Sequence, residues 1–283
     1  MIHLLFLLLL PLYPFSSNAE GDALQSEIRI VSLSPNLTEI LFEIGAGQQL
    51  VGTVDYSNYP EAAKQIPQVG SYNRINLEAV LALQPDLIVG WESGNAPSEI
   101  ARLRELGFTV HLSEPRQLED VATVMEQFGT LLGRSEQALQ KSAAYRQRLQ
   151  QLRDQYQQQQ TVSVFYQVWN RPLLTINGEQ IISRVIELCG GINIFADLDT
   201  LSPQISIEAV LAENPQVIVA SGMDKSRPEW LDEWKKYSLL QAVQRNNLYH
   251  VPPDILQRHG PRLIQGVEQL CHALQSARNN TRP

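Results

Sequence analysis

Two glutamates occupy the same position in a stretch of sequence that the chain contains twice. Residues 75–90 read INLEAVLALQPDLIVG and residues 205–220 read ISIEAVLAENPQVIVA, with nine of sixteen positions identical. The repeated glutamates are Glu78 and Glu208. A carboxylate in the first turn of a helix stabilises that helix by ~0.3–1 kcal/mol through the helix dipole. On position alone, each glutamate is explained by the helix that it begins.

Motifs for covalent or metal chemistry are missing from the sequence. It contains no G-x-S-x-G nucleophile elbow, no P-loop and no H-E-x-x-H motif. Asp55 and Asp254 lack a spacing that indicates an acid/base pair. His111, His250 and His272 are scattered and do not have the spacing of metal ligands. We therefore expect neither an enzyme nor a metal site, which leaves binding proteins and structural or adhesion proteins.

Both copies of the repeat are expected to form a capped helix followed by a strand. Asn76 and Ser206 are favourable N-cap residues directly before the helices, and Pro85 and Pro215 end them. Strand-like and helix-like runs alternate in both halves of the chain. This alternation predicts an α/β fold with two Rossmann-like lobes, each built on a mostly parallel sheet.

The middle of the chain lacks strand signals and is predicted to connect the lobes. We expect helices over residues 117–160, with a break at Gly133-Arg134-Ser135 and then a helix of about 25 residues, about 35 Å long. Such a helix can act as a strut, although its Gln-rich end, 157–160, is also consistent with a flexible linker. The N-terminal lobe then covers residues 20–116 and the C-terminal lobe residues 161–283.

The first 19 residues form an apolar run that suits a signal peptide and ends in the small residues Ser17-Asn18-Ala19. The run lacks an early Lys or Arg, so a retained anchor is the alternative. No Cys follows it, which argues against a lipoprotein. Because no later apolar stretch has membrane-spanning length, we expect an exported, soluble mature chain.

Charge and cysteine content narrow the class of protein further. A formal net charge of −8 and a pI near 5.2 argue against nucleic-acid binding, which needs clustered Lys and Arg. Cys189 and Cys271 could form a disulfide in an oxidising compartment, or they could remain two buried thiols.

Several motifs, in order along the chain, carry a resemblance to a known family. They are SLSPNLTEILFEIGAG at 32–47, VGTVDYSNYPEAA at 51–63, the two copies of the repeat and the long helix between them. Together they resemble the substrate-binding proteins of ABC importers for cobalamin and siderophores, over nearly all of residues 28–275. The resemblance implies two α/β lobes joined by a single long helix, a ligand held in the cleft between them, a periplasmic location and a Cys189–Cys271 disulfide.

The cobalamin-binding members of this family are the most similar, so cobalamin or a related corrinoid is the expected ligand, as transported cargo and not as a cofactor. A corrin ring has apolar faces and a fringe of amides, so its site needs aromatic walls with a few donors and acceptors. The resemblance assigns ligand contacts to Tyr56, Tyr72, Trp91, Trp169, Asp254 and Arg258. Leu201-Ser202 is a departure, because cobalamin-binding members have a Trp before Pro-Gln at this place.

Two questions about the ligand stay open at this point. His259 could contact the ligand's metal, since neutral imidazole suits such metals, or it could be a polar surface residue. A ferric siderophore or haem is the alternative ligand, and Arg74, Arg171 and Arg258 could serve its negative charge.

The resemblance also implies a partner for the repeated glutamates. In this family each lobe presents a Glu to Arg clusters on paired permease subunits, and the matching positions are Glu78 and Glu208. The implied partner is a two-fold symmetric ABC permease with its ATPase subunits. A monomer that docks on the two-fold axis of such a permease needs the same anchor twice. The single stiff helix between the lobes further predicts a small closure on ligand binding.

Overall fold

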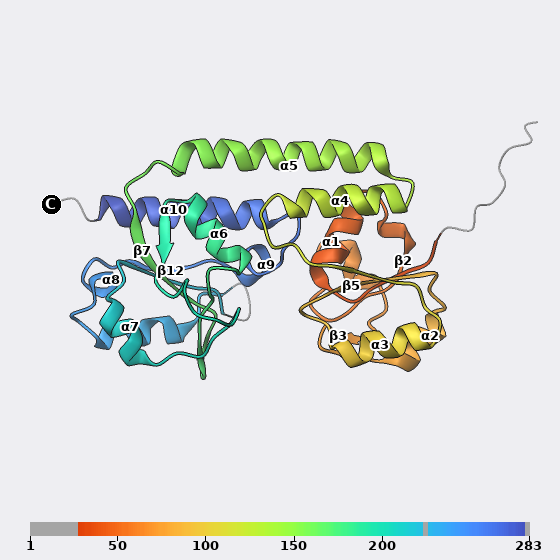
Figure 1. Cartoon of the computed structure of the whole chain (residues 1–283), viewed down its shortest axis with the longest axis horizontal. Helices are drawn as coiled ribbons and strands as arrows, with labels where there is room; N and C mark the ends of the chain where they lie inside the picture. The colour runs from red at the N-terminus through yellow and green to blue at the C-terminus, as the bar shows by residue number, and fades with distance from the viewer. Residues whose placement is uncertain (1–27, 223–225, 281–283) are drawn as a thin grey trace, which may run out of the picture.

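The computed structural model describes residues 28–222 and 226–280, and the expected signal peptide, residues 1–19, lies outside them. Figure 1 shows two lobes side by side beneath one long helix, α5 (Ser135–Tyr156). The predicted architecture of two α/β lobes connected by a single long helix is therefore confirmed.

Each lobe is built on a four-stranded parallel sheet. The strands of the N-terminal sheet are β1 (Ile30–Ser32), β2 (Leu50–Gly52), β5 (Leu87–Trp91) and β6 (Val110–Ser113). Those of the C-terminal sheet are β7 (Val162–Gln167), β10 (Gly191–Asn193), β11 (Val217–Ala220) and β12 (Leu248–His250). The strand orders β2-β1-β5-β6 and β10-β7-β11-β12 are the same when each lobe's strands are counted from its own first strand. The duplication seen in the repeat thus extends to the four-stranded sheet of each lobe.

Helices and short hairpins complete the lobes. The N-terminal lobe has α1 (Pro35–Glu43), α2 (Leu77–Leu83), α3 (Pro97–Glu105), the 3₁₀ helices η1 (Gly47–Gln49) and η2 (Glu61–Gln65), and a hairpin of β3 (Gly70–Ser71) and β4 (Arg74–Ile75). The C-terminal lobe has α6 (Ile181–Leu188), α7 (Ile207–Glu213), α8 (Gln241–Gln244), α9 (Pro253–Leu256), α10 (Leu263–Asn279), the 3₁₀ helix η3 (Glu229–Lys236), and a hairpin of β8 (Trp169–Asn170) and β9 (Leu173–Leu174). Of the helices in the described ranges, none is both long and apolar enough to cross a membrane.

The repeated unit forms the same element in both lobes. The side chains of Asn76 and Ser206 each accept a hydrogen bond of 3.1 Å from the backbone N–H three residues later, as predicted for N-caps. Both helices end at a residue in the left-handed conformation, Gln84 at φ 44° and Asn214 at φ 45°. In Figure 1, α2 and α7 lie at the lower edge of their lobes, on the side away from α5.

The connecting segment breaks where the sequence predicts it. Helix α4 (Asp120–Leu131) ends before Gly133, which has a φ of 67°, and α5 begins at Ser135. At 22 residues, α5 spans about 33 Å. It ends at Tyr156, so the Gln-rich residues 157–160 lie after the helix.

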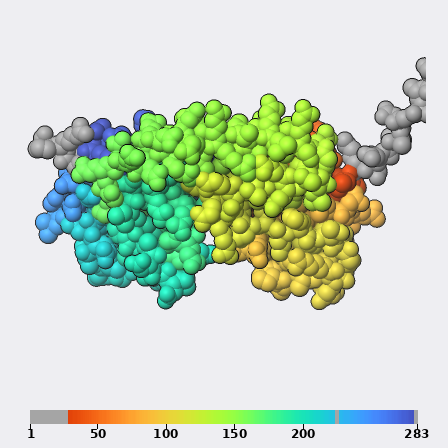
Figure 2. All heavy atoms as spheres, turned by 45° about the horizontal axis from the view of Figure 1, so that its top comes forward, coloured from red at the N-terminus to blue at the C-terminus, as the bar shows by residue number. Residues whose placement is uncertain are grey.

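One buried apolar cluster runs through both lobes. It includes Leu37 of α1, Phe128 of α4, Leu149 of α5, Val164 of β7 and Leu270 of α10. The space-filling view in Figure 2 shows α5, in green, lying across both lobes. The lobes therefore share a core and are not joined by the chain alone.

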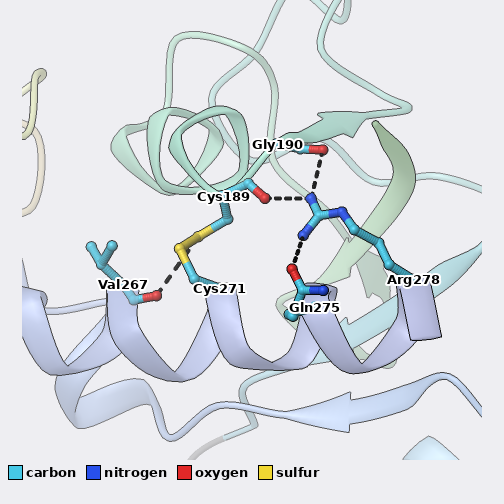
Figure 3. Close-up of a disulfide and its surroundings, with 6 residues drawn as sticks. All are labelled: Cys189, Gly190, Val267, Cys271, Gln275 and Arg278. Carbon is cyan, nitrogen blue, oxygen red and sulfur yellow. Dashed lines mark hydrogen bonds between the residues drawn. A yellow bond between two sulfur atoms is a disulfide. The ribbon is translucent and has the colours of Figure 1, made fainter. Parts of the chain in front are cut away.

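A disulfide fastens α6 to α10 in the C-terminal lobe (Figure 3). Cys189, directly after α6, is bonded to Cys271 of α10, with 4.7 Å between the Cα atoms, as the resemblance implied. Next to it, the Arg278 guanidinium donates hydrogen bonds to the backbone oxygens of Cys189 at 2.6 Å and Gly190 at 3.0 Å. These bonds satisfy carbonyl groups that the end of a helix leaves without intrahelical partners.

Candidate functional site

A cavity of about 700 Å³ lies between the lobes. Much of its lining comes from the ends of β1, β2 and β5 in the N-terminal lobe and of β7, β11 and β12 in the C-terminal lobe. These are the carboxyl ends of parallel strands, where open α/β sheets bind their ligands. The turn of the β3–β4 hairpin and the segments after β9 and β10 complete the lining. Figure 2 shows the surface indented between the lobes on the side opposite α5. Loops from both lobes can thus contact one ligand.

The structure brings five of the six predicted ligand contacts to this cavity. Tyr56, Tyr72 and Trp91 line it from the N-terminal lobe, and Asp254 and Arg258 line it from the C-terminal lobe.

The sixth predicted contact, Trp169, is not among the lining residues. Its indole N–H donates to the backbone oxygen of Arg171 at 3.1 Å, and its ring packs edge-on against Trp230, with 6.4 Å between centroids. The preceding residue, Val168, lines the cavity instead.

The aromatic wall is turned toward the cavity and away from the core. Tyr56 is 50% exposed, so it does not pack in the core. Its φ of 60° is left-handed, a conformation that is uncommon for residues other than glycine. The rings of Tyr72 and Trp91 lie 6.5 Å apart and are inclined by 40°. Such a surface is suited to the flat, apolar face of a large ring.

A buried charge cluster joins the lobes at the base of the cavity. Glu39 of α1 accepts hydrogen bonds from Arg262 at 2.6 and 2.9 Å and from Arg258 at 3.2 Å. Arg258 also donates to Asp254 at 2.7 Å and to Asn58 at 2.8 Å. The side chain of Glu39 is 2% exposed, and those of both arginines are 11% exposed. Buried charges persist when they are paired, and here the pairs cross from one lobe to the other.

Sequence reasoning missed Glu39 and Arg262. Burial alone lowers the pKa of Arg262, but the hydrogen bonds that it donates to Glu39 and the charges of Glu39 and Asp254 outweigh it, so its pKa is raised. Arg258 and Arg262 both lie in the short segment between α9 and α10, where no helical or strand periodicity relates them. Their partner in α1 is more than two hundred residues away, and no local pattern indicates it.

His259 is buried, which contradicts the alternative that it is a surface residue. It is 5% exposed, and within the described chain neither ring nitrogen has a hydrogen-bond partner. Its ring lies 5.9 Å from that of Trp91, edge-on, so the two lobes meet at this contact. Burial lowers the pKa of His259 to about 4, which leaves the imidazole neutral at neutral pH. Among residues 28–222 and 226–280, no three His, Cys, Asp or Glu side chains form a group that could hold a metal ion.

Asp55 also lines the cavity, although sequence reasoning did not assign it to the ligand. Burial raises its pKa, and a hydrogen bond from the Tyr72 backbone N–H lowers it. Its Oδ1 is buried and has no hydrogen-bond partner in the part of the chain that the structure describes. A buried polar atom without a partner is unusual in a folded protein and marks a place where a ligand can bind.

Glu78 and Glu208 lie apart from the cavity. Both are exposed in the first turns of α2 and α7, and neither lines the cavity. Neither has an ion pair with any residue that the structure describes. Their role in docking stays a prediction.

Known proteins match this chain over most of its length. A family model described as periplasmic binding protein matches residues 30–255. The vitamin B12-binding protein of Vibrio cholerae (strain ATCC 39541) is 39% identical over 249 residues, which cover 88% of this chain and 90% of that protein.

Solved structures share the arrangement of the lobes. A crystal structure of the periplasmic vitamin B12 binding protein of Vibrio cholerae has a TM-score of 0.82 and 38% identity, covering 88% of this chain and 97% of that one. A periplasmic heme-binding protein from Roseiflexus, in its apo form, has a TM-score of 0.80 and 24% identity, covering 89% and 99%. The second match concerns the fold alone.

Proposed function

This chain belongs to the periplasmic binding protein family, and we propose that it captures cobalamin between its lobes and delivers it to an ABC importer. The similarity to vitamin B12-binding proteins, over 88% of the chain, supports cobalamin as the cargo. The protein binds and releases this cargo without converting it. The alternatives are a ferric siderophore or haem.

The observation that carries the proposal is the combination of an aromatic wall with a cation that is already paired. Tyr56, Tyr72 and Trp91 line the cavity with aromatic rings. Arg258 is held by carboxylates, so it is not available to pair with an anionic cargo. Haem and many ferric siderophores carry negative groups that are commonly held by free arginines. A corrinoid, with apolar faces and neutral amides, suits this wall better.

Co-elution tests the cargo directly. The purified chain is incubated separately with cyanocobalamin, hemin and a ferric siderophore, and then passed over a size-exclusion column. We expect visible absorbance to travel with the protein for cyanocobalamin. Binding of hemin or the siderophore without binding of cyanocobalamin would overturn the proposal in favour of the alternative.

For delivery, Glu78 and Glu208 are the anchors on a permease with two like subunits. Each lies in the first turn of its helix, α2 or α7, and the two lobes have sheets of the same strand order. Both side chains are exposed. The same carboxylate presented by each lobe matches a receptor that offers the same basic pocket twice. Removing one partner of a desolvated carboxylate–arginine pair costs roughly 2–5 kcal/mol.

Paired substitutions test the docking role. Glu78→Ala combined with Glu208→Ala should leave cobalamin affinity unchanged and abolish transport into vesicles that contain the importer. Glu136→Ala is the matched control, because Glu136 is an exposed first-turn glutamate of α5. Normal transport by the double variant, or a loss of cobalamin affinity, would contradict the docking role.

A further inference from the structure

Asp55 is an ionisable group of the cavity wall that pairs with no cation among the residues the structure describes. It follows β2, and its backbone N–H donates to the Gly70 oxygen at 2.9 Å. Its carboxyl group accepts a hydrogen bond from the Tyr72 backbone N–H, and its Oδ1 is left without a partner. Burial raises its pKa, so the carboxylate lacks part of the solvation that water would supply.

The charges elsewhere at the cavity balance one another. Arg258, the cation among the described lining residues, bonds to Asp254 and Glu39. Arg262, behind it, bonds to Glu39 as well. Two arginines therefore face two carboxylates in this cluster. Asp55 adds a negative charge that no side chain in the cluster offsets.

We propose that Asp55 is a specificity-determining residue that selects the charge of the cargo at its part of the wall. Its carboxylate accepts hydrogen bonds from the amide N–H groups around a corrinoid ring, and it rejects a cargo with a carboxylate there. The inference rests on the proposed cobalamin function. Amide donors supply the partner that the buried oxygen lacks, whereas two like charges in a partly buried wall repel each other. Rejection of this kind is a common basis of specificity.

Ligands that differ only in one charge distinguish a selection of charge by Asp55 from a general contribution to binding. Cyanocobalamin carries amides around its ring, and each of its monocarboxylic derivatives has one amide hydrolysed to a carboxylate. At about pH 8, above the usual carboxyl range, the wild-type chain should bind at least one derivative about tenfold or more weakly than cyanocobalamin. Isothermal titration calorimetry measures both affinities.

The variant Asp55→Asn is expected to bind that derivative and cyanocobalamin with affinities within about twofold of each other, because the charge is removed. Asparagine keeps an acceptor oxygen for the Tyr72 N–H, so the loop can hold its place. Asp86→Asn is the control for net charge. Asp86 is exposed and precedes β5, at the opposite end of that strand from Trp91, so this variant should discriminate as the wild type does.

Each other outcome has a definite meaning. If Asp55 only holds the Tyr72 loop, Asp55→Asn leaves the ratio of the affinities for cyanocobalamin and the derivative unchanged, or it lowers both affinities equally. Either result overturns the inference. Equal binding of cyanocobalamin and all derivatives by the wild type overturns the inference and leaves the proposed function standing. Failure of the wild type to bind cyanocobalamin overturns the proposed function, and the inference with it.

Discussion

At the scale of single residues, the buried imidazole of His259 links the stability of the fold to pH. Its pKa is lowered to about 4, from 6.5 for an ordinary histidine, because burial disfavours the charged form. Between these values the unfolded chain binds more protons than the folded chain. The free energy of unfolding therefore carries no penalty from His259 above pH 6.5, and it falls as the pH drops toward 4. By about pH 4.5 the loss from this residue is about 2 kcal/mol.

Urea unfolding at about pH 7 and about pH 4.5 measures this effect. His259→Leu should shrink the difference in unfolding free energy between the two pH values by about 2 kcal/mol. His272→Leu is the control, because His272 is exposed on α10. If both variants keep the wild-type difference in unfolding free energy between the two pH values, His259 is not the source of the pH dependence.

A second prediction at this scale compares two tryptophans. Trp91 lines the cavity, whereas Trp169 packs on Trp230 outside the lining. Trp91→Leu should weaken cyanocobalamin binding about tenfold, since a lost aromatic contact costs about 0.5–1.5 kcal/mol beyond its buried area. Trp169→Leu should change the affinity less than about twofold. Calorimetry on both variants tests this ranking, and an equal loss would restore Trp169 as a ligand contact.

How far sequence could predict the site depends on where each residue's partner lies. Tyr56 follows β2, Trp91 ends β5 and Tyr72 lies in the turn of the β3–β4 hairpin. The resemblance assigned all three to the ligand, and the carboxyl ends of parallel strands, which meet at one edge, bring Tyr56 and Trp91 to the cavity. Glu39 is a buried residue of α1, and its arginines come from the other lobe. No local sequence pattern indicates such a partner. The same holds for Asp55, whose environment exists only once the β3–β4 hairpin has folded against it.

At the scale of elements, the local sequence predicted more of the structure than it did at the scale of single site residues. Helix boundaries at Asn76, Ser206 and Gly133 follow from capping side chains and from a left-handed glycine, which act within a few residues. The equal topology of the lobes followed from the repeat and from the alternation of strands and helices. The pairing of α6 with α10 needed the resemblance, because cysteine spacing alone left it open.

The disulfide between α6 and α10 should stabilise the fold without shaping the cavity. Its cysteines are 82 residues apart, and a loop of that length gives at most ~4–5 kcal/mol in the chain-entropy model. Neither Cys189 nor Cys271 lines the cavity. Cys189→Ser combined with Cys271→Ser should therefore lower the unfolding free energy by up to about 4 kcal/mol and leave cyanocobalamin affinity within about twofold. Denaturant titration and calorimetry measure the two effects, and a large loss of affinity would contradict the separation.

At the scale of the whole molecule, two features resist opening of the cleft. The apolar cluster is continuous from α1 through α5 to α10, so separating the lobes would expose it. The charge cluster of Glu39, Arg258 and Arg262 crosses between the lobes in a buried setting. A hinge held by packed and paired groups moves less than one held by extended strands alone. We therefore expect small-angle scattering to show little compaction when cyanocobalamin is added, and a large compaction would contradict this.

The charge cluster and a surface ion pair on the same helix allow this rigidity to be tested. Glu39→Gln leaves two buried arginines without their shared carboxylate, which should cost about 3 kcal/mol of unfolding free energy. Glu43, one turn later in α1, pairs with Lys141 of α5 at 2.8 Å, and both side chains are more than a third exposed. Glu43→Gln should therefore cost less than about 1 kcal/mol.

The two variants should also differ in shape. With spin labels on α2 and α7, the distance distribution between the lobes should broaden and shift to longer values in Glu39→Gln and stay unchanged in Glu43→Gln. Arg258 would then lose a fixed position in the cavity wall, so cyanocobalamin affinity should fall in the first variant alone. If Glu39→Gln lowered stability while the distances and the affinity stayed as in the wild type, the cluster would contribute to folding and the lobe angle would be set by the shared core.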